Sequence, residues 1–578
     1  MALTSLDYGI IILYLLVSLG IGLSLRKRAG KSVTNFFLGG RNLPWWIAGT
    51  SMVATTFAAD TPLAVTELVA QGGIAGNWLW WNMLAGGMLT TFFFARYWRR
   101  ANILTDIELT ELRYSGIAAR FLRGFRALYF GVFLNAIIIG WVNLALGALL
   151  QIFFDVPDNQ LLYYYAVAML LVVFYTSLSG LLGVAFTDVI QFTIAISGSI
   201  VLAVIVVNSP EVGGIEQLTA KLPEGALSFF PAIGDAAGAG TTLSLGVGSF
   251  FAYIGIQWWA SWYPGNEPGG GGYVAQRMMS TKNEQHAIYA TLFFQIAHYC
   301  IRPWPWILVA LSALVLYPDL SAEDQKLGYV MAMQDYLPAG LKGLLLVAFL
   351  AAYMSTISTQ LNWGTSYVIN DFYRRFVNPD AGEEQLVPAS RIATLLLMLV
   401  ALIATSFMDT ISGVWQFLIE CGAGLGLVLI LRWYWWRVNA WSEVAASVTP
   451  ILAYATARLL GWEFPDSFFF TVGVTTVSWL VVTYVTPTTD SSHLQQFYDK
   501  VKPEGNWKPF SGTDHTNSRI PMLLTAWISA VITAYMALFF TGSLIFRHWQ
   551  EVGLYGSIGL AALFILRYAS KKVNIFEG

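Results

Sequence analysis

The stretch Ala54-Thr55-Thr56-Phe57-Ala58-Ala59-Asp60-Thr61-Pro62 places an acid, a proline and several hydroxyl side chains inside an apolar segment that runs from about residue 45 to 69. Pro62 lacks a backbone donor and disfavours helix at Thr61, so the sequence predicts an interrupted helix here. Unwound backbone at membrane depth survives only where it lines a cavity, and its freed carbonyls can bind ions and solutes. An ordinary proline kink is the alternative interpretation.

The composition places this segment in a membrane. The chain has 578 residues, of which 56% are hydrophobic and only 11% are charged, and its mean hydropathy is +0.59. A soluble protein of this length would carry far more charge. We therefore predict an all-α polytopic membrane protein, because β-barrel strands would show alternating polarity over about ten residues. The net charge of −2 gives no indication of nucleic-acid binding.

Roughly fifteen apolar stretches are long enough to cross a bilayer. Lysine and arginine concentrate in every second loop, including Arg26-Lys27-Arg28, whereas the predicted outer loops contribute only Lys221 and Lys326. The positive-inside rule then predicts a multi-pass protein of the cell (inner) membrane, with the N-terminus outside. The stretches lie at about 7–25, 45–69, 74–97, 127–154, 161–178, 183–207, 243–263, 287–316, 343–368, 390–409, 412–435, 443–460, 467–486, 521–546 and 552–569.

A second acid, Asp188, lies near the start of another apolar stretch, in the run from Ser179 to Gln191. A carboxylate at bilayer depth is costly unless a cation, a partner or a water cavity compensates it, so Asp188 is a candidate for a functional site. The alternative is a salt bridge between Asp188 and an arginine of a loop.

The stretch at about 343–368 carries polar side chains on one helical face. Hydroxyl oxygens beside the carbonyls of a broken neighbouring helix suit a small hard cation. The hydroxyls could instead bond to their own helix or to a neighbour, as is common in membrane helices. The aligned residues are Ser355, Ser358, Thr359, Asn362 and Ser366.

Several spaced motifs resemble those of one transporter family. They are Phe36-Phe37-Leu38-Gly39-Gly40-Arg41-Asn42-Leu43-Pro44-Trp45-Trp46 with Gly49-Thr50-Ser51, then Thr187-Asp188-Val189-Ile190-Gln191, and Gln276-Arg277-Met278 with Lys282-Asn283. In this order, over about residues 7–440, the chain is similar to the sodium:solute symporter family. The stretches after about residue 440 carry no such motif.

The resemblance implies a five-plus-five inverted-repeat (leucine-transporter-like) core with an extra N-terminal helix and additional C-terminal helices. The first helix of each repeat should be broken. In the second repeat the counterpart is Gly255 to Ser261, although the glycines that follow at 269–272 depart from the family pattern. The expected parts are 1–44 (extra helix and cytoplasmic loop), 45–207 (repeat 1), 208–242 (extracellular loop), 243–436 (repeat 2) and 437–578 (C-terminal helices).

The resemblance also implies Na⁺ as the bound ion. The main sodium site would use carbonyl oxygens of Ala54, Phe57 and Ala352 together with the hydroxyls of Ser355 and Thr356. Some family members bind a second sodium ion, and this chain matches their pattern, so we expect two ions per cycle. The matching residues of that second site are Asp188, Ser355, Ser358 and Thr359.

We expect the solute just outside the ion site, between the broken helices. Tryptophan pairs could stack on a sugar face or hold a cationic amine, although they could equally be packing aromatics. Asp60 matches an acid position of the family's proline transporters. The candidates are Thr56, Asp60, Thr61, Trp80, Trp81, Asn82, Asn135, Gln257, Trp258, Gln416 and Glu420.

These observations predict a sodium-driven symporter, not an enzyme, that imports a small organic solute (an amino acid, a sugar or similar) by alternating access. We expect it to work as a monomer in the lipid bilayer. Two alternatives stay open: proton coupling through Asp60 or Asp188, and a non-transporting sensor or receptor with the same fold. The second alternative predicts a soluble signalling domain, and no stretch is long enough for one.

Overall fold

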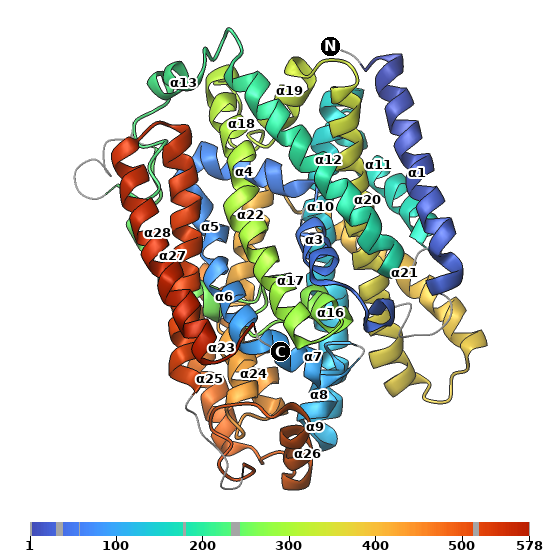
Figure 1. The fold of residues 1–578 in the computed structure, drawn as a ribbon. Helices are drawn as coiled ribbons and strands as arrows, with labels where there is room; N and C mark the ends of the chain where they lie inside the picture. The colour runs from blue at the N-terminus through green and yellow to red at the C-terminus, as the bar shows by residue number, and fades with distance from the viewer. Residues whose placement is uncertain are drawn as a thin grey trace.

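Helices make up the body of the protein. A computed structural model describes residues 3–29, 38–56, 58–103, 105–176, 181–232, 243–511 and 519–576. Figure 1 shows the helices side by side, with the N-terminus and α13 at one end and α26 at the other. In the described ranges there is no β-strand, only the isolated bridges Leu43–Thr281 and Trp435–Asn506. The predicted all-α architecture is confirmed.

The first half of the chain contains the predicted broken helix. It folds into α1 (Ser5–Ala29), α3 (Trp45–Thr55), α4 (Asp60–Gly72), α5 (Trp78–Trp81), α6 (Met83–Leu89), α7 (Ala95–Ala101), α8 (Glu108–Arg113), α9 (Gly116–Leu128), α10 (Asn135–Phe154), α11 (Asp158–Thr176), α12 (Leu181–Val207) and α13 (Ile215–Lys221).

The second half follows the same pattern and ends in extra helices. It folds into α14 (Val247–Ala252), α15 (Trp258–Ala260), α16 (Gly272–Ser280), α17 (Glu284–Ile296), α18 (Pro303–Leu316), α19 (Leu327–Tyr336), α20 (Leu341–Ser366), α21 (Glu383–Thr405), α22 (Ile411–Cys421), α23 (Leu425–Tyr434), α24 (Ala440–Leu459), α25 (Asp466–Val485), α26 (Ser491–Val501), α27 (Ile520–Ile545) and α28 (Trp549–Lys572).

Many of the membrane segments are interrupted. In the described part of the chain, eight helical segments are long and apolar enough to cross a membrane, and the bent pair α22 and α23 would make a ninth. Each of the roughly fifteen predicted stretches nevertheless contains helix. Several are divided by π-helical turns, as at Tyr129–Leu134 and Ala297–Ile301.

The two predicted interruptions are both present. Helix α3 ends at Thr55 and α4 begins at Asp60, while Phe57 lies outside the described residues. Thr61 is helical, so the break lies before Thr61 rather than at it. The reason is that Pro62 falls in the first turn of α4, where a missing N–H costs little. In the second half α15 ends at Ala260 and α16 begins only at Gly272.

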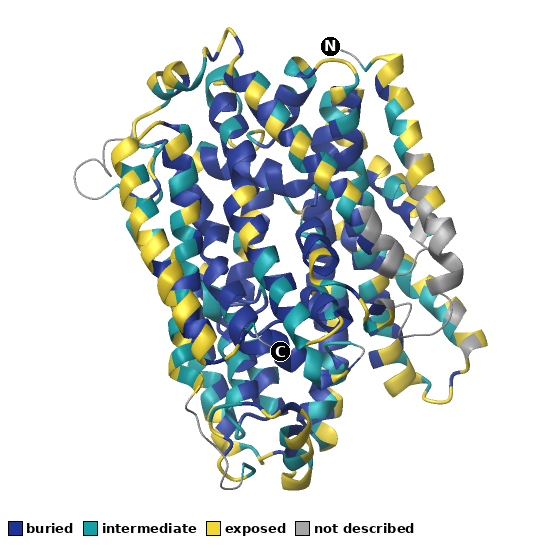
Figure 2. Ribbon diagram, viewed as in Figure 1, coloured by how far each residue is buried: buried dark blue, intermediate teal, exposed yellow. Residues whose placement is uncertain are grey.

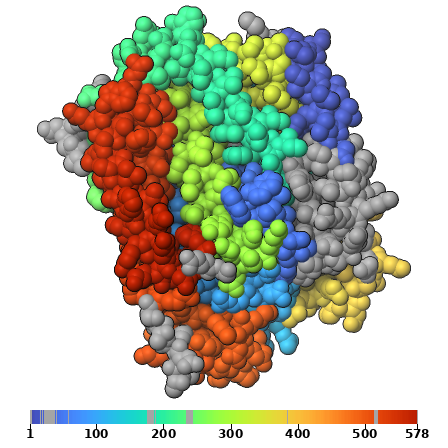
Figure 3. Space-filling model, in the orientation of Figure 1, coloured from blue at the N-terminus to red at the C-terminus, as the bar shows by residue number. Residues whose placement is uncertain are grey.

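Burial follows from this arrangement. Figure 2 shows the central helices α3, α4, α5, α10 and α22 largely buried, while α1, α27 and α28 carry many exposed residues. The pair α27 and α28 covers one side of the molecule (Figure 3), and α27 packs against α6. Outward-facing apolar residues such as Leu563 and Phe564 suit contact with lipid.

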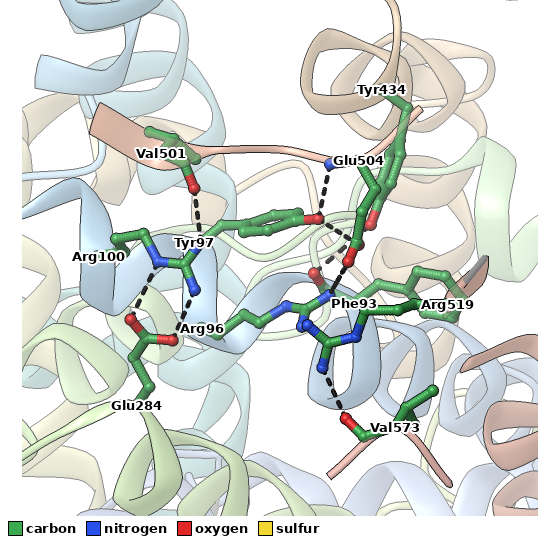
Figure 4. Close-up of polar contacts among 10 residues, drawn as sticks. All are labelled: Phe93, Arg96, Tyr97, Arg100, Glu284, Tyr434, Val501, Glu504, Arg519 and Val573. Atoms are coloured by element: carbon green, nitrogen blue, oxygen red, sulfur yellow. Dashed lines mark hydrogen bonds and ion pairs between the residues drawn. The ribbon is translucent and has the colours of Figure 1, made fainter. Parts of the chain in front are cut away.

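A cluster of charged residues ties the C-terminal part to the core at the α26 end. Glu504, in the loop after α26, accepts hydrogen bonds from Arg96 (2.8 and 2.7 Å) and from Tyr97 (2.6 Å), both on α7. Arg100, one turn further along α7, pairs with Glu284 and donates to the carbonyl of Val501 (Figure 4). These contacts join segments separated by about 400 positions in sequence.

We expect Glu504→Ala to destabilise the protein, because it leaves the largely buried Arg96 without its carboxylate. The loss should be about 3–5 kcal/mol, measured as a lower melting temperature and faster proteolysis of the loop after α26. Glu216→Ala is the control, since Glu216 pairs with Arg547 at the surface, with both side chains more than half exposed. It should change stability by less than about 1 kcal/mol. Equal effects of the two variants would contradict this assignment.

Candidate functional site

A cavity lies beside the break between α3 and α4. From this segment Thr55, Thr56, Ala58, Asp60 and Thr61 line it. The remaining wall comes from α5, α10, α20, α22, the loop that follows α15 and the π-helical turn before α18. The cavity therefore adjoins the element that the sequence predicted to be unwound.

Four of the predicted solute residues line this cavity, namely Thr56, Asp60, Thr61 and Trp80. The carboxylate of Asp60 is only 3% exposed, and its Oδ1 has no hydrogen-bond partner in the described part of the chain. A buried carboxylate oxygen without a partner is costly. Such an oxygen suits a hydroxyl or ammonium group of a bound molecule.

Trp80 brings an aromatic surface to the same cavity. Its ring stacks on Tyr299, with centroids 5.6 Å apart and planes inclined by 27°, and lies 5.5 Å from the ring of His298. Its indole N–H is already held by Asn77 at 2.9 Å. The ring position is therefore fixed by neighbours before any solute arrives.

The neighbouring Trp81 faces away. It packs against Phe539 of α27 with ring centroids 6.3 Å apart, and its carbonyl accepts a hydrogen bond from Tyr535. Successive residues of a helix point about 100° apart, so Trp80 and Trp81 cannot share one cavity. Trp81 belongs to the packing of the C-terminal helices.

The other predicted solute residues are held elsewhere. Asn82 and Gln257 donate to backbone carbonyls near Leu79, and Asn135 donates to the carbonyl of Gln360. Trp258 lies beside Trp527 in a separate aromatic pocket. Buried amides satisfy carbonyls freed by short helices, which explains why these polar residues do not reach the cavity.

Gln416 and Glu420 also lie apart from the central cavity. They line a polar groove between α22 and α24 together with Arg458 and Glu463. Glu420 accepts a hydrogen bond from Ser467 at 2.5 Å. Their side of α22 faces α24 and α25, whereas Trp415, one residue before Gln416, lines the cavity.

The cavity contains residues that the sequence did not single out. Gln360 follows Thr356 by one helical turn, so the polar face of α20 carried a signal for it. The loop after α15 supplies Tyr263 and Asn266, which could have been found as members of the second break. No sequence pattern marked the rest: Ile138, Trp141, Val142, Pro264, Tyr273, His298, Tyr299 and Trp415.

The hydroxyls expected to bind sodium have no other partner. Ser355, Thr356, Ser358 and Thr359 make no hydrogen bond within the described residues, although most hydroxyls in the other helices donate to their own backbone, as Thr291 does to Ala287. Helix α20 packs against α3, and Thr356 lines the cavity. Uncommitted hydroxyl oxygens next to a broken helix fit the oxygen preference of a hard cation.

Asp188 is buried against α3. It is 1% exposed and accepts a hydrogen bond from Ser51 at 2.7 Å. Arg277 of α16 donates to the same Ser51 hydroxyl at 3.3 Å and to Thr55 at 3.1 Å. The acid and the arginine thus meet across a serine of the broken helix. Helix α12 also packs against α20, whose hydroxyls are the other half of the predicted second sodium site.

A family model and several relatives match this chain. The model of the sodium:solute symporter family matches residues 36–448. The chain belongs to the sodium:solute symporter family. The sodium/glucose cotransporter of Vibrio parahaemolyticus is 24% identical over 503 residues, covering 82% of this chain and 89% of its own length. The sodium/mannose cotransporter of Bos taurus is 25% identical over 435 residues, covering 68% of each.

A solved structure shows the same fold. It is the substrate-bound outward-open state of a Na⁺-coupled sialic acid symporter, with a TM-score of 0.63, 19% sequence identity, and coverage of 84% of this chain and 99% of that chain. The leucine-transporter-like fold expected from the motifs is confirmed. As a family member, this multi-pass membrane protein is a sodium-coupled solute transporter and not an enzyme.

One further carboxylate braces the symporter beside its cavity. Glu67 of α4 is fully buried and accepts hydrogen bonds from the backbone N–H groups of Ile411 (3.1 Å) and Ser412 (2.7 Å). These are the first residues of α22, where unpaired N–H groups favour an acceptor with negative charge. Glu67 therefore joins the second half of the broken helix to α22.

We expect Glu67→Ala to lower the melting temperature of the symporter, because two buried N–H groups lose their acceptor, at about 1–3 kcal/mol each. Glu67→Gln keeps one acceptor and should lose less. The control is Glu323→Ala, an exposed side chain whose loss should change stability by at most about 0.5 kcal/mol. A melting temperature of Glu67→Ala equal to that of the control would rule out this brace.

Proposed function

We propose that this symporter imports a small, hydroxyl-bearing organic solute such as a sugar, and that two sodium ions move with it in each cycle. The observation that carries the proposal is the set of uncommitted α20 hydroxyls facing the break between α3 and α4. The proposal includes the inverted repeats at 45–207 and 243–436, a monomer as the working unit, and the α26 end in the cytoplasm.

The solute class rests on the chemistry of the cavity. Aromatic rings such as Trp80 offer faces for stacking, while Asp60, Asn266 and Gln360 offer hydrogen-bonding groups. Stacking combined with several acceptors and donors suits a polyhydroxylated ring. The names of two relatives, a sodium/glucose and a sodium/mannose cotransporter, agree with this choice.

The main sodium site rests on oxygen ligands from two elements. We assign it the carbonyls of Ala54, Phe57 and Ala352 with the hydroxyls of Ser355 and Thr356. The first element is the end of α3 and the break after it, and the second is the middle of α20. Sodium bound there would hold the two elements together, so ion binding and the shape of the solute cavity would change together.

The second ion rests on Asp188, with Ser355, Ser358 and Thr359 as its other ligands. Arg277 offsets part of the Asp188 charge through Ser51, and an ion would have to share the carboxylate with this network. One sodium ion entering down about 100 mV and a tenfold gradient gains about 3.7 kcal/mol. Two ions would support accumulation of a neutral solute by roughly 10⁵-fold, and one ion by only hundreds-fold.

The direct test is uptake into liposomes that contain the purified protein. A thermal-shift screen with and without sodium first identifies a solute that stabilises the protein. Uptake of that solute should require an inward sodium gradient at fixed pH and should stop when choline replaces sodium. Accumulation driven by a proton gradient without sodium would favour the proton-coupled alternative, and binding without any uptake would favour a sensor.

We expect Asp188→Asn to lower the Hill coefficient of sodium activation from about two to about one, because the carboxylate of the second site is lost while an acceptor for Ser51 remains. Steady-state uptake across a range of sodium concentrations measures this coefficient. Asp371→Asn is the control, since Asp371 pairs with Arg123 away from the cavity. A Hill coefficient that stays at its wild-type value in Asp188→Asn would refute the second ion site.

Adjacent tryptophans give a matched test of the solute site. We expect Trp80→Phe to raise the KM for the solute about fivefold, because the ring that lines the cavity becomes smaller. Trp81→Phe should leave KM unchanged, since Trp81 packs against Phe539. Transport kinetics at saturating sodium distinguish the two variants. If both variants shift KM equally, the cavity is not the solute site.

A further inference from the structure

Arg302 is fully buried where the π-helical turn Ala297–Ile301 meets α18. One of its terminal nitrogens donates to the carbonyl of Val53 at 2.7 Å and to the hydroxyl of Thr56 at 3.2 Å. The other donates to the carbonyl of Thr56 at 3.2 Å. A single guanidinium thus holds both the last turn of α3 and the first residue of the break.

The chemistry of a helix end explains why an arginine suits this position. The last carbonyls of a helix have no donor from the following turn and carry partial negative charge. Inside a membrane protein water cannot replace that donor freely. A planar guanidinium presents two nitrogens at fixed spacing, so it can hold two carbonyls at once, whereas a lysine ammonium is a point charge on a flexible stem.

The neighbours of Arg302 fix its direction. Its guanidinium lies over the ring of Trp306, 4.8 Å from the centroid, and the charge of Asp60 lies within electrostatic range. The ring of His298 approaches the Thr56 hydroxyl, at 3.5 Å. Arg302 is not among the residues that line the cavity. Its described contacts are therefore to the broken helix rather than to the space where a solute would bind.

The two carbonyls held by Arg302 have a specific relation to the proposed sodium ligands. Val53 directly precedes Ala54, and Thr56 directly precedes Phe57. A hydrogen bond that fixes one peptide plane limits the rotation of the next, because only two backbone dihedrals separate them. The guanidinium therefore restricts the directions in which the next carbonyls, those of Ala54 and Phe57, can point.

We propose that Arg302 is a positioning residue for sodium binding: its guanidinium bridges the carbonyls of Val53 and Thr56 and orients the next carbonyls toward the hydroxyls of α20. This inference rests on the proposed main sodium site. It adds a residue that touches neither ion nor solute and that sets the affinity for sodium through the backbone.

The chain provides a control with the same chemistry elsewhere. Arg113 of α8 is also fully buried and donates to the carbonyls of Arg432 (2.9 Å) and Trp435 (3.2 Å) at the end of α23. Arg113→Lys therefore removes a bridge between carbonyls at a helix end that is not the break. It should lower stability without changing sodium activation.

The experiment measures sodium activation and solute KM for Arg302→Lys in liposomes. We expect the sodium concentration for half-maximal uptake to rise about tenfold, the equivalent of one lost charge-assisted hydrogen bond. The solute KM at saturating sodium should stay within about twofold of wild type, because uniform solute contacts are untouched. Trp306→Phe, which weakens only the stacking beneath the guanidinium, should give a smaller rise and guards against misfolding of the lysine variant.

Each outcome is decisive. Unchanged sodium activation in both variants, or an equal shift in Arg113→Lys, would overturn the positioning role. A higher solute KM with unchanged sodium activation would also overturn it and would place Arg302 at the solute. Failure of the proposed function is distinguishable, since wild-type uptake would then be independent of sodium.

Discussion

The structure depends on how the protein satisfies backbone groups that a helix normally satisfies itself. Between Thr55 and Asp60 the chain leaves the helix at a depth where lipid offers no hydrogen bonds. Side chains from distant elements take over this task. Arg302 reaches the break from the start of α18 and Arg277 reaches it from α16. The same constraint that endangers the fold creates the directed oxygens of a binding site.

Burying charge beside this break requires compensation. Arg277 meets Asp188 through Ser51, and Arg302 has Asp60 within electrostatic range. Two arginines and two acids therefore surround α3 and its break, with no net charge. Isolated charges at this depth would cost several kcal/mol each. Local neutrality lets the protein keep carboxylates beside a cation site, and a bound sodium ion adds charge to a network that is already balanced.

Local sequence predicted those parts of the site that depend on local chemistry. Pro62 and Asp60 indicated the break, and the spacing of hydroxyls along α20 indicated the face that carries Thr356. What failed was the direction of single side chains. Trp80 and Trp81 have the same local composition, and only the packing of α27 decides which one lines the cavity. The contact of Glu504 with Arg96 spans about 400 positions, so no local pattern could predict it.

Contacts at the two ends of the protein complete the argument. Glu67 joins α4 to α22 beside one end of the cavity. At the α26 end, Arg100 joins α7 to Glu284 of α17 and to the backbone at Val501. Alternating access needs each end to open in turn, so each set of contacts must break and form again during a cycle. A few hydrogen bonds of about 1 kcal/mol each match the few kcal/mol that ion binding can supply. Contacts much stronger than these would hold the transporter in one state, and much weaker ones would allow a leak.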